Sequence, residues 1–273
     1  MFMDLIIIGN GFDKAHGIAC SYRDFRNYLE RTDDHVLLFL EEAFPRENKN
    51  HDLMLWSDFE EALAFPDVNL LEEWGDSIHI LDENNKDVGW LIDGLKKAFC
   101  GWIEDLCFEG SISLPEGHPY KRFLNKDNVY LCFNYTDTLE RFYDINDVNY
   151  IHGKVFHQGN KTGLPLVFGH RHIEADNNPF VLATEKPVEA IIEKKTEWFS
   201  RLSKEIKGQI VVMGLSCSEV DQKYLKKIHS VLPKIKWRFF YYSRDDKVKI
   251  ISCANKIGLS KSDYVLESSS EQQ

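Results

Sequence analysis

The sequence predicts an α/β protein with a parallel, doubly wound sheet and a helical insertion. Short apolar runs alternate with amphipathic segments, the pattern of strands and crossover helices. Several of these runs end in polar, glycine-bearing turns, and between about residues 30 and 120 the apolar spacing becomes helical. We therefore expect a core from residues 1–29 and 121–266, a helical insertion at 30–120 and a disordered tail at 267–273.

The first half of the chain opens with a strand and continues with helices. The β-branched run up to Ile8 predicts a buried strand, and Ser21 with Asp24 resembles a capping box that starts a helix. Ser57 and Glu60 form a second such box at the start of the insertion. The segment 88–108 places apolar residues at helical spacing and completes the insertion.

The second half returns to alternation. Strands are predicted at 128–133, 148–153, 166–170, 208–214, 236–242 and 263–267. Helices are predicted at 188–207, from about Glu219, and at 245–258. Because ligands of such sheets bind at the carboxyl ends of the strands, the segments that follow the strands are the candidates for function.

Composition narrows the class of protein. The chain has 273 residues, a formal net charge of −11 and a pI of about 5.4, so its overall field repels phosphate and we expect no nucleic-acid partner. The 6 cysteines include no Cys-x-x-Cys pair, which favours reduced core thiols over a structural zinc site. No targeting or membrane segment is recognisable, and we expect a cytoplasmic protein without membrane partners.

Polar residues follow four of the predicted strands. Those after the first strand are Gly9, Asn10, Gly11, Phe12 and Asp13, and the later groups are Asn134 to Asp137, His152 with Gly153, and Gly214 with Ser216. Glycine turns can aim backbone N–H groups at phosphate or ribose. Each group also has a structural explanation: a tight turn, an Asx turn at Asp13, helix caps at Asn134 and Ser216, or a core histidine. Lys14 stands where the dinucleotide fingerprint requires a third glycine.

Six segments together resemble the bacteriophage abortive infection family AbiH, from residue 5 to about residue 228. They are LIIIGNGFDKAHGIACSYRDF, WSDFEEAL, FNYTDTLE, IHG, FGH and GLSCSEVDQKYL. More distantly, the chain resembles the sirtuin-like, Rossmann-like NAD-binding fold through Gly9-Asn10-Gly11, Gly17-Ile18, Asp24-Phe25-Arg26, Asn134 and His152-Gly153, in that order. It departs from that pattern at Thr136, where sirtuin-like defence proteins carry an Asp. Five residues separate Gly17-Ile18 from Asp24, where sirtuins have a single proline, and the sirtuin zinc module is absent from the sequence.

The resemblance implies an antiviral hydrolase that binds NAD and cleaves its nicotinamide–ribose bond, with no metal expected. His152 would act as the base, Asn134 would hold the ribose and a water, and Asp137 would bind the carboxamide of the leaving nicotinamide. The cofactor-binding residues would be Gly9, Asn10, Gly11, Phe12, Asp13, Phe25, Arg26, Gly214 and Ser216. A phage-encoded trigger protein and a second copy of the chain are the expected partners.

Two other functions stay open. His170 and His172 in FGHRH resemble the closing motif of a metallophosphoesterase. Together with His152 and Asp13 they would hold two metals and cut phosphodiesters. A pocket that only binds would make the protein a nucleotide- or phage-protein-sensing module. Metal dependence separates the first alternative from NAD cleavage, and product analysis after incubation with NAD separates either enzyme from a binder.

Overall fold

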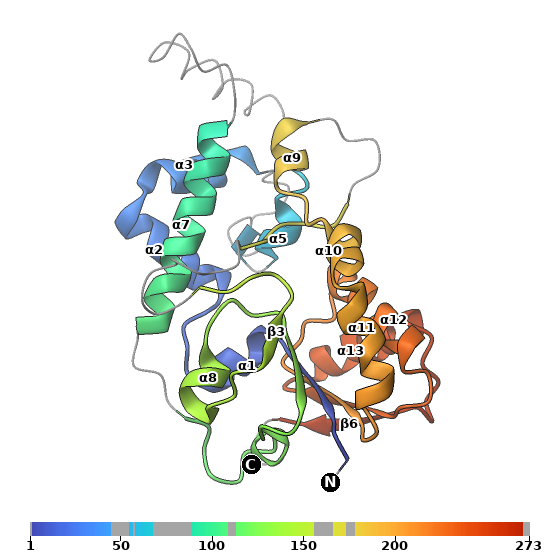
Figure 1. Ribbon diagram of the computed structural model, residues 1–273. Helices are drawn as coiled ribbons and strands as arrows, with labels where there is room; N and C mark the ends of the chain where they lie inside the picture. Colours follow the sequence, from blue (N-terminus) through green and yellow to red (C-terminus); the bar gives the residue numbers. More distant parts are fainter. Residues whose placement is uncertain are drawn as a thin grey trace. The chain divides into compact units, whose positions relative to one another are not determined.

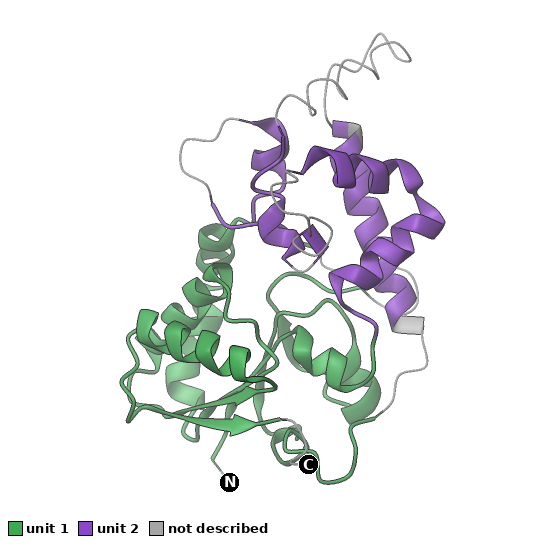
Figure 2. Cartoon of the chain, turned by 180° about the vertical axis from the view of Figure 1, so that it is seen from behind, with its two compact units in different colours: residues 1–18, 107–166, 187–273 green, residues 19–106, 167–186 purple. Residues whose placement is uncertain are grey.

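We describe the protein from a computed structural model, over residues 2–44, 55–56, 58–67, 89–108, 113–155, 166–172 and 178–269. The chain forms two units, which Figure 2 shows in different colours. Unit 1 comprises residues 1–18, 107–166 and 187–273, and unit 2 comprises residues 19–106 and 167–186. The predicted insertion, 30–120, overlaps unit 2, which also takes in 19–29 and 167–186.

Unit 1 is built on a parallel sheet. Within the described residues its strands are β1 (Leu5–Ile8), β2 (Val129–Cys132), β3 (Val148–Tyr150), β4 (Ile210–Met213), β5 (Trp237–Tyr241) and β6 (Tyr264–Ser268). They follow the order β3-β2-β1-β4-β5-β6, and all pairs are parallel. This is the order of a Rossmann-type sheet, and it confirms the predicted fold class. β1 and β4 are buried along their whole length, as their unbroken apolar sequences require.

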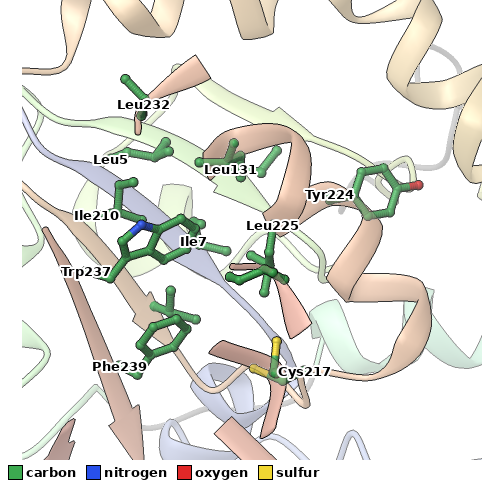
Figure 3. Packing of buried hydrophobic residues seen from close by; sticks show 14 of the residues in the cluster. Leu5, Ile7, Leu131, Ile210, Cys217, Tyr224, Leu225, Leu232, Trp237 and Phe239 are labelled. Atoms are coloured by element: carbon green, nitrogen blue, oxygen red, sulfur yellow. The ribbon is translucent and has the colours of Figure 1, made fainter. Parts of the chain in front are cut away.

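Helices cover both faces of this sheet (Figure 1). α10 (Val188–Lys194), α11 (Thr196–Glu205), α12 (Glu219–Val231) and α13 (Arg244–Lys256) share a core with Leu5, Ile7 and Val212, part of which Figure 3 shows. α1 (Asn10–Ala15), the 3₁₀ helix Lys121–Phe123 and α8 (Thr138–Tyr143) share a second core with Ile6 and Ile8. Successive strand residues point to opposite faces, so one apolar run supplies both cores.

Unit 2 is helical in its described part. It contains α2 (Tyr22–Thr32), α3 (Asp34–Ala43), α5 (Phe59–Ala62), α9 (Pro179–Ala183) and most of α7 (Gly89–Phe108). Its core centres on Phe25, which is fully buried and packs against Trp56, Phe59 and Trp102 at centroid distances of 6.4, 5.5 and 5.1 Å. The capping box at Ser21 is present, and Ser57 of the second box lies outside the described residues.

Three segments differ from the sequence-based expectation. The helix expected at 188–207 is two helices, because Lys195 leaves the helical conformation between them (φ −101°, ψ 16°). The strand expected at 166–170 is reduced to one bridge between His170 and Glu185, because Gly169 takes a φ of +142°. The last strand runs further than expected: Glu267 and Ser268 lie in β6, and the N–H of the following Ser269 donates to the Tyr241 carbonyl at 2.8 Å. Residues 270–273 lie outside the described residues.

Within the described ranges, no helix combines the length and the apolar composition needed to cross a membrane. Cys20, Cys132, Cys217 and Cys253 are buried free thiols, as expected for core cysteines.

Candidate functional site

The register of the sheet brings the polar segments of unit 1 to one edge. Ile8, the last residue of β1, is paired with Cys132 of β2 and Met213 of β4, and Cys132 is paired with Tyr150 of β3. The residues that follow these four strands therefore leave the sheet side by side. Between β1 and β4 the strand order reverses, which is where ligands of such sheets bind.

The glycine turn after β1 packs directly on the turn after β4. The N–H groups of Gly9 and Gly11 donate to the carbonyls of Met213 and Gly214 at 2.9 and 2.8 Å. A Cβ on Gly9 would lie 2.5 Å from the Cα of Leu215, and a Cβ on Gly11 would lie 2.8 Å from the Cα of Gly214. Close backbone packing therefore requires glycine at both positions, and their predicted contact with phosphate would have to replace these main-chain hydrogen bonds.

Asp13, in α1, is a buried carboxyl group with one oxygen bonded. It is 1% exposed, and the Thr136 hydroxyl donates to its Oδ2 at 2.5 Å. The hydroxyls of Thr136 and Thr138 lie 3.2 Å apart, which extends the chain of polar groups into α8. Oδ1 of Asp13 has no hydrogen-bond partner among the described residues. Burial raises the pKa of Asp13 to about 6, and the side chains of Thr136, Thr138 and Asn134 offset part of that effect.

Asn134 links the end of β2 to the glycine turn. Its side chain is buried, and Nδ2 donates to the Gly9 carbonyl at 3.1 Å. Asp137, at the start of α8, forms an ion pair with Arg141 one turn later, with Oδ1 and Nε 3.2 Å apart. Of these two predicted catalytic residues, Asn134 therefore contacts the glycine turn, whereas Asp137 is paired within its own helix.

His152 packs against the same segment through aromatic rings. Its ring lies 5.4 Å from Phe133 and 6.4 Å from Tyr135, the two residues that flank Asn134. Its Nε2 is 3.3 Å from the hydroxyl of Tyr224 in α12. In Figure 3 that hydroxyl points away from the other labelled core side chains. The described contacts of His152 with this segment are therefore with the two neighbours of Asn134. His152 is 3% exposed, so the surrounding residues cover it almost completely.

Lys154, Glu140 and Tyr150 form a buried polar cluster that was not among the predicted site residues. Lys154 is 5% exposed and pairs with Glu140, whose other oxygen accepts a hydrogen bond from the Tyr150 hydroxyl at 2.7 Å. Burial is the main cause of the raised pKa of Tyr150. The available signal was the position of Lys154, a charged residue two places after His152 at the end of an apolar strand. Thr136 gave no such signal, because its partner Asp13 is 123 positions away.

The other predicted binding residues have structural partners. The Ser216 hydroxyl donates to Asp221 at 2.7 Å and so supports the capping box of α12. Phe25 and Arg26 belong to unit 2, where Phe25 is core and Arg26 Nε donates to Glu41 at 2.7 Å. Asn10 is exposed at the start of α1, and Phe12 is buried in the core beside it. Their role toward a ligand stays a prediction.

The histidines of FGHRH lie in unit 2 and serve its packing. His170 is fully buried, with its ring nitrogens 2.5 Å from the Arg171 carbonyl and 3.0 Å from the Val181 carbonyl. His172 contacts Glu185 at 2.9 Å. Among the residues that the structure describes, no three His, Cys, Asp or Glu side chains gather as metal ligands do. Because carbonyl oxygens engage both nitrogens of His170, this geometry does not favour the phosphoesterase alternative.

Comparison with known proteins supports the resemblance. No curated protein matches the chain. The family model described as "Bacteriophage abortive infection AbiH" matches residues 5–241, which covers β1 through β5 and all of unit 2. The chain therefore belongs to the bacteriophage abortive infection family AbiH.

Proposed function

We propose that this member of a phage-defence family binds NAD at the carboxyl edge of β3, β2, β1 and β4 and cleaves the nicotinamide–ribose bond. One observation carries the proposal: Asn134 is bonded to the glycine turn, and His152 packs on both neighbours of Asn134. Segment 133–137 therefore contacts both the glycine turn after β1 and His152. It does so next to the position where the strand order reverses, where dinucleotides bind in sheets of this type.

The reaction needs little from the protein beyond placement and one proton transfer. Nicotinamide leaves the ribose through a transition state with oxocarbenium character, as a sugar does in glycoside cleavage. A water then bonds to the ribose carbon and loses a proton, which the His152 imidazole accepts. The Asn134 amide would orient the ribose and the water without adding charge. The Asp137 carboxylate would accept hydrogen bonds from the carboxamide N–H groups of nicotinamide.

Burial favours a second candidate, a sensing module without catalysis. Asp13, Asn134, Asp137 and His152 are each less than a tenth exposed. A ligand therefore has to open the edge before it can touch them. If a phage-encoded trigger protein opens the edge, the enzyme stays inactive until infection supplies that protein. The same opening without a chemical reaction would make the protein a sensor.

Incubation with NAD separates the two candidates. We would measure nicotinamide release by chromatography, with and without lysate of phage-infected cells, for wild type, His152→Ala and Asn134→Ala. Removal of a general base costs about 10²–10⁴ in rate, so His152→Ala should lose detectable release. His35→Ala and Asn27→Ala are matched controls, because both residues are exposed on helices of unit 2 and neither belongs to any of the predicted sites. Binding of NAD without nicotinamide release in either condition would favour the sensor.

Plating of phage on cells carrying the same variants gives the biological readout. If a folded His152→Ala protein protects cells as well as wild type, His152 has no catalytic role in defence.

A further inference from the structure

Asp13 is held in an arrangement in which burial outweighs the groups that favour its charge: the side chains of Thr136, Thr138 and Asn134 lower its pKa, and burial raises that pKa by more. Thr136 satisfies Oδ2, whereas Oδ1 is buried and has no hydrogen-bond partner among the described residues. A carboxylate oxygen in that position loses its water without gaining a donor, which is costly in a folded protein. The neutral acid does not carry this cost to the same degree.

The contact with Thr136 ties Asp13 to the candidate catalytic segment. Thr136 lies between Tyr135 and Asp137, and two residues after Asn134. The bond therefore joins α1 to segment 133–137 in addition to the bond between Asn134 and Gly9. The hydroxyl of Thr138 continues the chain into the first turn of α8.

We propose that Asp13 is a positioning residue that holds segment 133–137 through Thr136, and that ionisation of Asp13 loosens this segment. When Asp13 is neutral, the segment lies closed on α1. When it is ionised, exposure of Oδ1 to water or to a donor from a ligand is favoured, and the segment has to move to allow it. In its consequence for catalysis this inference rests on the proposed function, since that segment carries Asn134 and Asp137.

The groups around Asp13 allow its ionisation to be separated from theirs. Arg141 of α8 lowers the pKa of Asp13, and burial raises the pKa of both Cys132 and Tyr150 above their ordinary values. Glu140 and Lys154 act on the same Cys132 and are paired with each other. Burial lowers the pKa of His16, on the same helix, to about 4. His152 contacts the segment through Phe133 and Tyr135. A pH effect that came from His152 would persist in the variant Asp13→Asn, so that variant separates the two groups.

Hydrogen exchange of the full-length protein without ligand tests the proposal. We would follow the amides of 133–137 between pH 5 and 8, correcting for the intrinsic pH dependence of exchange. In wild type, protection should fall with a midpoint near 6, the pKa of Asp13. In Asp13→Asn, protection should not depend on pH. A midpoint that persists in Asp13→Asn, or none in wild type, would overturn the proposal.

Variants of Thr136 keep the test decisive if Asp13→Asn does not fold. Thr136→Ser retains the hydroxyl and should keep the wild-type midpoint. Thr136→Val removes the bond through which Asp13 holds the segment, so protection should be low across the whole range and the midpoint should be lost. Equal midpoints in these two variants would contradict the role of the Thr136 hydroxyl.

The rate of NAD cleavage gives a separate readout. The pH profile of kcat should carry the same midpoint in wild type and lose it in Asp13→Asn. If wild type releases no nicotinamide but the exchange midpoint is present and depends on Asp13, the positioning role stands and the proposed function fails. If cleavage occurs without that midpoint in exchange, the positioning role fails alone.

Discussion

Replacing Asp13 by Asn should stabilise the protein, and more strongly at high pH. Burial raises the pKa of this carboxyl group from 3.8 to about 6, so the folded state binds a proton that the unfolded state releases. Wild-type stability from this group is therefore fully present below pH 4 and is lost as the pH rises through 6. An uncharged Asn of the same shape does not carry this loss.

The size of the effect follows from the two pKa values. Each pKa unit corresponds to about 1.4 kcal/mol, so the shift amounts to about 3 kcal/mol once Asp13 is fully ionised. At pH 8 the variant should exceed wild type by about 3 kcal/mol, and at pH 4.5 by only about 1 kcal/mol.

Urea unfolding followed by circular dichroism at a series of pH values measures this difference. Asp144→Asn is the control, because Asp144 is exposed and paired with Lys126, and it should gain nothing at high pH. The reasoning is refuted if Asp13→Asn is no more stable than wild type at pH 8, or if its advantage does not shrink below pH 6.

Three further predictions test the packing and the chemistry. Gly214→Ala should cost about 1–3 kcal/mol more than Gly117→Ala: both glycines have positive φ, but a Cβ on Gly214 meets the Phe12 nitrogen at 2.3 Å and one on Gly117 meets nothing within 4 Å. Equal costs in urea unfolding would mean that backbone strain alone decides. Glu60→Gln should cost about 3 kcal/mol, since it leaves the Lys186 ammonium, 3% exposed, without its carboxylate; loss of less than 1 kcal/mol would argue against this. Release of nicotinamide should continue in the presence of EDTA. If EDTA abolishes the activity and manganese restores it, the phosphoesterase alternative is favoured.

Patterns that depend only on neighbouring residues allowed much of the fold to be predicted. The apolar runs that became β1, β2, β4 and β5 could be recognised because a strand buried on both faces needs apolar residues throughout. The capping box at Ser21 is equally local, since its hydrogen bonds span three residues. The strand predicted at 166–170 was wrong, because only His170 pairs there, with Glu185, and that contact depends on residues distant in the chain.

The candidate site was predictable only as a set of segments. Alternation of strands and helices implies parallel strands, and parallel strands place Gly9, Asn134, His152 and Gly214 at one edge. Which atoms meet there was not predictable. Thr136 stood out in the sequence only as a departure from a related motif, and the fold makes it the partner of Asp13.

The sequence by itself therefore determined the fold class, the family and the edge of the sheet on which polar residues gather, because strand patterns and motifs are properties of consecutive residues. Only the tertiary structure decided that Gly9 and Gly11 are needed for contact with the turn after β4, and that Phe25 is a core residue of unit 2. It also decided that Asp13 is a buried acid, one oxygen of which has no donor among the described residues. Hydrogen bonding, burial and the pKa of a carboxyl group depend on atoms that folding brings together from distant parts of the chain, here from residues 13 and 136.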